Sequence, residues 1–229
     1  ASLIKNMGFI FFRQGKVEQA LKNYNEALTV FLKHNDKKKV AETYTNIGHC
    51  CYEKYDDEGA LLNFKKAVAL SLEVKDTITV AKLYNNIGAV YIDDKKDTIS
   101  GLNYLLKAID IKEKLNDQDG LIFQYNNIAN VYVSKKKYNL AEKYLSKSYE
   151  LAIKAGNKEE LKEIYEIYSL LYNGKGNFEK AYQYHIKYAK VKDTLLNIEN
   201  LKAVQEIQTK YQTAKKEKLL IEKEAENKR

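Results

Sequence analysis

One asparagine recurs at the same place in successive segments of the sequence, and it is the polar feature with the clearest potential for recognition. The four residues are Asn6, Asn46, Asn86 and Asn127. Asparagine is a mediocre helix former, so its repeated use inside an apparent helix indicates a specific role. Its side chain offers both a hydrogen-bond donor and an acceptor, the pair of groups needed to bind the backbone of an extended peptide. The alternative is that each asparagine bonds to a neighbouring helix and fixes the angle between repeats.

No grouping of residues in the sequence predicts catalysis, and none predicts a metal or cofactor site. The sequence has no glycine-rich phosphate loop and no Ser/His/Asp grouping with a supporting motif. His34, His49 and His185 are far apart, and no paired Cys or His has metal-ligand spacing. Cys50 and Cys51 are adjacent, so a disulfide between them would be strained. We therefore expect a protein that is not an enzyme and that carries neither a cofactor nor a metal.

The asparagines belong to an internal repeat that must position them. The stretch at residues 84–91 is written again at residues 125–132, with looser copies upstream and downstream. A small residue recurs in steps of 40, 40, 41 and 40, at Gly8, Gly48, Gly88, Ala129 and Ser169. A fixed period of this length is typical of a solenoid. The absence of proline and the presence of only 10 glycines predict an all-helical chain.

Each repeat reads as two amphipathic helices, which we call helix A and helix B. In the second repeat the apolar and small positions are Tyr44, Ile47, Gly48 and Cys51 on helix A and Ala60, Leu61, Phe64 and Ala67 on helix B. Residues of the N-cap type recur just before each helix A, at Asp36, Asp76, Asp117, Asn157 and Asn197. Their side chains can accept hydrogen bonds from the unpaired amides of the first helical turn.

These positions resemble the tetratricopeptide repeat, a helix–turn–helix unit with this order of aromatic, aliphatic and small residues. The resemblance covers residues 2 to about 192. It implies an all-α, right-handed superhelix of five repeats, at about 1–36, 37–76, 77–117, 118–157 and 158–196, followed by a long C-terminal helix at 197–229. The usual repeat of the family has about 34 residues and is closed by proline. The longer repeats of this chain, which lack proline, are similar to those of kinesin light chains and of bacterial peptide-sensing regulators.

The resemblance also implies where a ligand would bind. In the family, the A helices line a concave groove, and the asparagine series matches positions that face bound peptide. Further candidates on this face are Lys5, Phe9, Thr45, His49, Lys82, Asn85, Asn126 and Asn130, with Arg13 and Tyr52 further along. Four hydrogen bonds contribute about 2–6 kcal/mol. Micromolar binding needs about 8 kcal/mol, so side-chain pockets must add to the affinity of a polar or mixed peptide.

A stricter family site, the clamp that grips a C-terminal carboxylate, is matched only in part. Lys5, Asn46 and Lys82 occupy matching positions, but Phe9 stands in place of an asparagine and Asn86 in place of an arginine. The loss of the arginine removes the bidentate carboxylate contact. We do not expect that clamp.

The net charge of +8 does not predict nucleic-acid binding. Acidic residues are interspersed among the lysines, 31 against 39 basic residues, and the short lysine runs at 37–39 and 135–137 lie in or beside turns.

No apolar run is long enough to span a membrane, and no signal peptide is present. The chain begins and ends inside apparent helices, so we expect it to be a piece of a longer protein. Any contact with a membrane would come from a segment outside it.

The C-terminal region has two open interpretations. A heptad seam with one charged residue, Lys218, runs in steps of three and four through Val204, Ile207, Tyr211, Ala214, Lys218, Ile221 and Ala225. This seam predicts either a homodimeric coiled coil or signalling linker, or a solvated helix that caps the last repeat.

The stretch at 208–218 resembles the one that follows tetratricopeptide arrays in membrane-anchored bacterial sensor kinases and transcription regulators. That resemblance implies a sensing region on the periplasmic side of the membrane. The alternatives are a cytoplasmic scaffold protein and an intracellular peptide-pheromone receptor.

Overall fold

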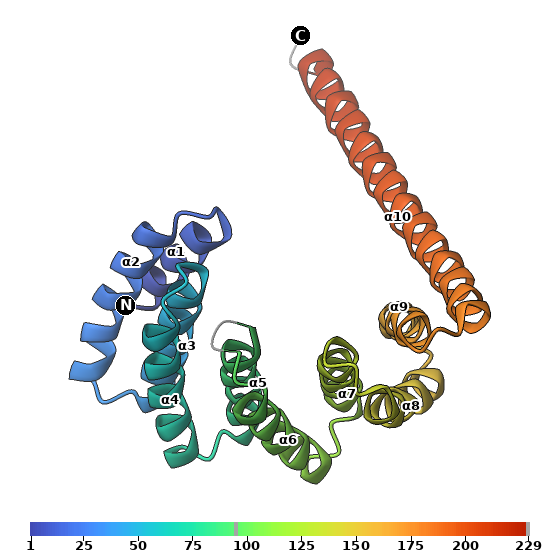
Figure 1. The fold of residues 1–229 in the computed structure, drawn as a ribbon. Coiled ribbons are helices and arrows are strands. Elements are labelled where there is room, and N and C mark those ends of the chain that lie inside the picture. Colours follow the sequence, from blue (N-terminus) through green and yellow to red (C-terminus); the bar gives the residue numbers. More distant parts are fainter. Residues whose placement is uncertain (94–95, 228–229) are drawn as a thin grey trace. The chain divides into compact units, whose positions relative to one another are not determined.

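The computed structural model describes residues 1–93 and 96–227, except for the side chains of residues 199, 203, 204, 211, 214, 215 and 217–227. Within these residues the chain forms ten helices and no strand (Figure 1). The helices are α1 (Ser2–Arg13), α2 (Val17–Lys33), α3 (Lys37–Glu53), α4 (Asp57–Glu73), α5 (Thr77–Asp93), α6 (Thr98–Lys114), α7 (Gln118–Ser134), α8 (Tyr138–Ala155), α9 (Lys158–Gly174) and α10 (Phe178–Asn227). The prediction of an all-α fold of tandem helices is confirmed.

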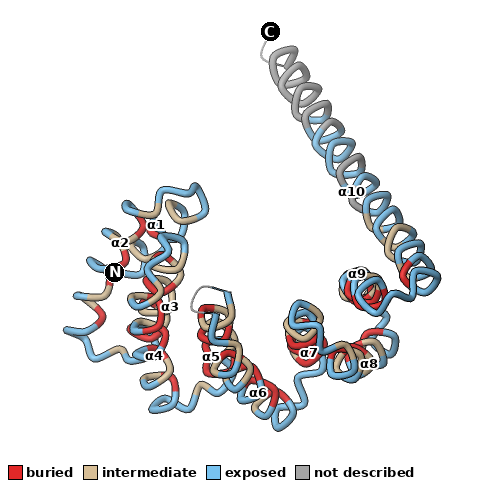
Figure 2. Tube along the Cα trace, viewed as in Figure 1, coloured by how far each residue is buried: buried red, intermediate tan, exposed pale blue. Residues whose placement is uncertain are grey.

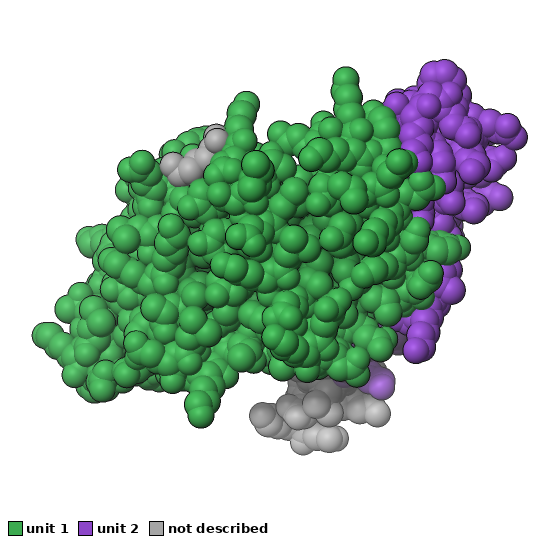
Figure 3. All heavy atoms as spheres, turned by 60° about the horizontal axis from the view of Figure 1, so that its bottom comes forward, with its two compact units in different colours: residues 1–151 green, residues 152–229 purple. Residues whose placement is uncertain are grey.

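The chain divides into two compact units, residues 1–151 and 152–229 (Figure 3). In the first unit each helix from α1 to α6 packs against the next one in the chain. In the second unit α9 packs against α10. Buried residues follow the facing sides of α1 to α9, whereas most of the described side chains of α10 are exposed (Figure 2).

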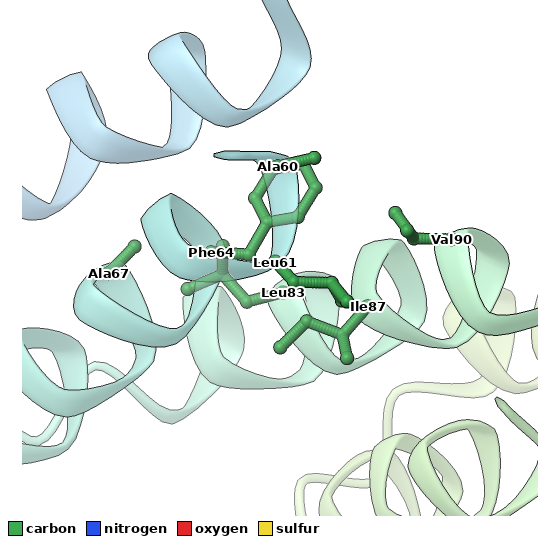
Figure 4. Packing of buried hydrophobic residues seen from close by; sticks show 7 residues of the cluster. All are labelled: Ala60, Leu61, Phe64, Ala67, Leu83, Ile87 and Val90. Atoms are coloured by element: carbon green, nitrogen blue, oxygen red, sulfur yellow. The ribbon is translucent and has the colours of Figure 1, made fainter. Parts of the chain in front are cut away.

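The core consists of contacts between helix B of one repeat and helix A of the next. One cluster joins α4 to α5 (Figure 4) and consists of Ala60, Leu61, Phe64, Ala67, Leu83, Ile87 and Val90. All seven side chains are at most 6% exposed. Because each repeat covers the apolar stripe of its neighbour, the stack needs no single central core.

The recurring small residues lie where the two helices of one repeat cross closely. A Cβ atom at Gly48 would lie 2.5 Å from Cε1 of Phe64 on α4. A Cβ atom at Gly8 would similarly lie 2.8 Å from the ring of Tyr24. The small residues therefore allow the two helices of a repeat to approach each other closely at these positions.

The side chain that faces the small residue differs between repeats. Gly8 and Gly48 face the aromatic rings of Tyr24 and Phe64. In the fourth repeat the equivalent pair is Ala129 and Leu145, and both residues are fully buried. In the third repeat a Cβ atom at Gly88 would lie 2.7 Å from Cδ2 of Leu105, so glycine also occurs opposite leucine.

The turns between helices share one backbone feature, a residue with a positive φ angle. Among the described residues each turn has one in the left-handed region, and three of these residues are glycines, Gly15, Gly156 and Gly176. The other left-handed positions are Asn35, Tyr55, Lys75, Lys96, Asn116 and Lys136. The residue that follows the left-handed position often hydrogen-bonds to both neighbouring helices. The N–H group of Asp36 donates to the carbonyl of Phe31 at 3.1 Å, and its carboxylate accepts from the N–H group of Lys39 at 3.1 Å. It thereby closes α2 and caps α3.

Four of the five predicted helix A caps are confirmed, and one is wrong. The side chains of Asp36, Asp76, Asp117 and Asn157 each accept a backbone hydrogen bond in the first turn of the following helix. Asn197 instead lies inside α10, which runs without a break from Phe178. Leu196 stands where the earlier turns have a left-handed polar residue or glycine, and the surrounding segment has no glycine or proline to end the helix. The division between domains at residue 197 stays a prediction.

The C-terminal seam lies within α10. Ile207 is 67% exposed, and the side chains of the other six seam residues lie outside the described part of α10. The coiled coil, the linker and the capping helix therefore all stay predictions.

Candidate functional site

Three members of the asparagine series lie at equivalent places on successive A helices. Asn46, Asn86 and Asn127 belong to α3, α5 and α7, and each is partly buried. We call the surface around these three residues the asparagine face. Asn6, on α1, is exposed.

Polar side chains on this face connect neighbouring A helices. The side-chain nitrogen of Asn86 lies 3.3 Å from Nε2 of His49, which joins α5 to α3. The nitrogen of Asn127 donates to Oδ1 of Asn85 at 3.2 Å, which joins α7 to α5. Lys5 pairs with Glu42 at 2.5 Å, which joins α1 to α3. Asn86 and Asn127 therefore contribute to packing between repeats. A role in binding is compatible with these contacts and stays a prediction.

A cavity of about 200 Å³ opens beside the link between Asn85 and Asn127. It is lined by Asn85, Ala89, Ile92, Asp93, Leu105, Asn127, Asn130 and Val131. Side-chain amides and one carboxylate stand next to aliphatic groups in this lining. The cavity can therefore bind a side chain and hydrogen-bond a polar group at once.

The contact between His49 and Asn86 should make the free energy of unfolding depend on pH. Burial lowers the pKa of the His49 imidazole, and the nearby Glu53 carboxylate opposes that shift only in part. Because the folded-state pKa lies below the unfolded value of about 6.5, the unfolded state binds more protons, and the contribution of His49 is lost as the pH falls below about 6.5. Protonation also removes the acceptor that Nε2 offers to Asn86. We expect urea titrations from pH 7.5 to 5 to show a smaller loss of stability in His49→Gln than in the unmodified protein. Parallel curves would contradict this.

The other candidates differ in accessibility. Asn126 is buried and only 6% exposed, which is too little for a surface contact without a local rearrangement. Lys82 and Asn130 are exposed, and Lys5, His49 and Asn85 are partly buried. Among the wider set, Thr45 donates to the carbonyl of Ala41, Tyr52 donates to Asp93 at 3.4 Å, and Phe9 and Arg13 are exposed.

A second cavity, of about 490 Å³, was not anticipated. It is lined by Ile78, Ala81, Lys82, Lys112, Leu115 and Asp117. Lys112 is only 9% exposed, and its ammonium donates to the carbonyl of Gly120 at 2.9 Å. A signal for this residue was present in the repeat, because the equivalent positions carry Phe31, Ser71 and Ala152, all buried. A lysine at this repeat position departs from the uncharged residues of the other repeats.

Other site chemistry is limited in the described part of the chain. Burial raises the pKa of the Cys50 thiol to about 12 and also raises that of Cys51, which keeps both thiols protonated and poorly nucleophilic. No group of metal-ligating side chains is present among the described residues. None of the helices in these residues is long and apolar enough to cross a membrane.

Two parts of the sequence match family models described as tetratricopeptide repeat, residues 1–73 and residues 125–154. Among curated proteins none matches the sequence.

Solved structures share the fold. BtubC (BKLC) from P. vanneervenii is 18% identical with a TM-score of 0.74, over 84% of this chain and 79% of that protein. A Podosopora anserina protein assigned as a kinesin light chain, with nearly identical TPR-like repeats, is 10% identical with a TM-score of 0.70, over 86% and 96%. A Rap protein complexed with competence and sporulation factor is 14% identical with a TM-score of 0.63, over 85% of this chain and 64% of that protein. At these identities the likeness shows a shared architecture.

Proposed function

We propose that this chain, a tetratricopeptide-repeat protein, is a non-catalytic module that binds an extended peptide or protein segment on its asparagine face. The observation that carries the proposal is the row of side-chain amides across α3, α5 and α7, next to the cavity at Asn85, Asn127 and Asn130. Amides can pair with the donors and acceptors of a peptide backbone, and the cavity can take a side chain. The Rap protein of similar fold, which is complexed with competence and sporulation factor, supports the same kind of ligand.

Removing the three amides should weaken peptide binding. Peptides would first be selected from a random phage-displayed library on the unmodified protein and measured by fluorescence anisotropy. The Asn46→Ala, Asn86→Ala, Asn127→Ala triple variant should raise Kd by tenfold or more, because three hydrogen bonds contribute about 1.5–4.5 kcal/mol.

The matched control removes three exposed asparagines from B helices, with Asn25→Ala, Asn103→Ala and Asn139→Ala. It should leave Kd unchanged. If the triple variant of the asparagine face folds normally and binds with unchanged affinity, the asparagine series has no part in the site.

A finer proposal is that the module is the sensing region of a larger bacterial signalling protein, on the periplasmic side of its membrane. One feature supports it: α10 begins against α9 and continues as a single helix of 50 residues, about 75 Å long. A displacement of its packed end would move the whole helix. About 20 apolar residues beyond Arg229, followed by a kinase or DNA-binding domain, would support this role. A stop codon there would favour a cytoplasmic scaffold or a peptide-pheromone receptor.

A further inference from the structure

Lys112 is a buried ammonium with few partners. Among the described residues its Nζ has one hydrogen-bond acceptor, the carbonyl of Gly120 at 2.9 Å, and it lies 5.9 Å from the ring centre of Phe123. No carboxylate of the described residues lies within 4.0 Å of it. An ammonium has three donors, and burying it is unfavourable unless charge and hydrogen bonds compensate. One neutral acceptor compensates only in part.

The nearest acidic group is already engaged. Asp117 lines the same cavity, but its Oδ1 accepts the N–H group of Gly120 at 3.0 Å and caps α7. Gly120 leaves room for both groups, because a Cβ atom there would lie 2.0 Å from Oδ2 of Asp117 and 2.8 Å from Nζ of Lys112. Because Gly120 has no side chain, the Lys112 ammonium can lie next to the first turn of α7.

The charges in the cavity do not balance. Lys112 and Lys82 contribute two positive charges and Asp117 one negative charge. Burial lowers the pKa of Lys112; the Asp117 carboxylate opposes this shift, and the Lys82 ammonium adds to it. A bound anion would supply the missing negative charge and further acceptors.

The walls of the cavity are aliphatic. Ile78, on α5, is 56% exposed, and Leu115, the residue that follows α6, is 44% exposed. They can cover an apolar side chain that adjoins the anionic group. The lining thus fits a carboxylate attached to an aliphatic segment better than a free inorganic ion.

We propose that the cavity lined by Lys112 and Lys82 binds a carboxylate of the peptide on the asparagine face, next to an aliphatic residue of that peptide. This proposal rests on the proposed function, because Lys82 belongs to the same helix as Asn85 and Asn86. It gives the ligand a specific chemical feature, one acidic group in an otherwise polar or mixed peptide.

The test uses the full chain, labelled with ¹⁵N, and the dipeptide N-acetyl-leucyl-glutamate as the probe. Saturable shifts of the backbone amide of Gly120 and its neighbours are expected. N-acetyl-leucyl-glutamine amide, which has no carboxylate, should bind about tenfold more weakly. Lys112→Met should weaken binding of the acidic dipeptide by a similar factor.

Lys114→Met is the matched control, because Lys114 is an exposed lysine of the same helix that pairs with Asp110. It should leave the titration unchanged. If Lys112→Met fails to fold, Lys82→Met at the exposed rim provides the second variant and should weaken binding severalfold.

Three results would overturn the proposal: equal binding of the two dipeptides, unchanged binding by folded Lys112→Met, or an equal response to inorganic phosphate. If the acidic dipeptide causes no shifts while the selected peptides still bind through the asparagine face, only this cavity is removed from the ligand site. Failure of the selected peptides to depend on the asparagine face would instead remove the proposed function.

Discussion

Gly48→Ala is expected to lower the free energy of unfolding by about 1–2 kcal/mol. The added methyl group would lie 2.5 Å from Cε1 of Phe64, a ring that is 1% exposed and closely surrounded. Overpacking of this kind costs about 1–3 kcal/mol, whereas the better helix propensity of alanine returns about 0.5–1 kcal/mol. The steric term therefore prevails. Urea denaturation of the variant and of the unmodified protein measures the difference.

The fourth repeat supplies the matched control. There, alanine at the equivalent position is paired with leucine, as Ala129 and Leu145. In the third repeat a Cβ atom at Gly88 would still lie 2.7 Å from Cδ2 of Leu105, so leucine reduces the contact without abolishing it. In a Phe64→Leu background, Gly48→Ala should therefore cost less than in the unmodified protein, and a double-mutant cycle should give a coupling energy of about 1 kcal/mol or more. An equal cost in both backgrounds would show that contact with Phe64 is not the reason for the glycine.

The sequence predicts the helix crossings well because the determinant is repeated. Gly8, Gly48 and Gly88 recur at a constant spacing, and a small residue with a large partner has a direct meaning for packing. The helix A caps are readable for the same reason. The confirmed part of the fold therefore depends on local patterns that occur several times.

The caps of the B helices and the left-handed turn residues were not predicted, although the capping residues are themselves of the N-cap type. Asp56, Asp97 and Asn177 cap the B helices, and each accepts a backbone hydrogen bond in the first turn of its helix. Lysine or tyrosine is not a residue that predicts a left-handed backbone, yet Tyr55 and Lys75 adopt one. In both turns the next residue donates to a carbonyl of the preceding helix, which holds that conformation.

The candidate site depends on distances between repeats, which the sequence does not contain. The type and spacing of Asn86 and His49 gave no indication that the two side chains would lie 3.3 Å apart. That distance follows from how α3 and α5 are both placed against α4. The sequence could nominate the asparagine face, but it could not distinguish a ligand contact from a link between helices.

Gln124→Leu is expected to raise the free energy of unfolding by about 1–3 kcal/mol. Gln124 is fully buried on α7, and neither its Nε2 nor its Oε1 has a hydrogen-bond partner among the described residues. An unsatisfied buried amide costs about 1–3 kcal/mol.

The repeat shows which residues this position accepts. The equivalent residues are Thr43, Leu83 and Ile164, all fully buried. Thr43 satisfies its hydroxyl by donating to the carbonyl of Lys39 at 2.7 Å, whereas the two aliphatic residues have no polar group to satisfy. Leucine has a volume close to that of glutamine, so the replacement should fit without overpacking.

Chemical denaturation should therefore show a higher midpoint for Gln124→Leu with an unchanged slope. The reverse change, Leu83→Gln, places an amide at the equivalent buried position and should destabilise the protein by at least a comparable amount. A lower midpoint for Gln124→Leu would mean that the amide is hydrogen-bonded in solution, for example to a buried water molecule. In that case the amide would contribute to the packing of α7 rather than weaken it.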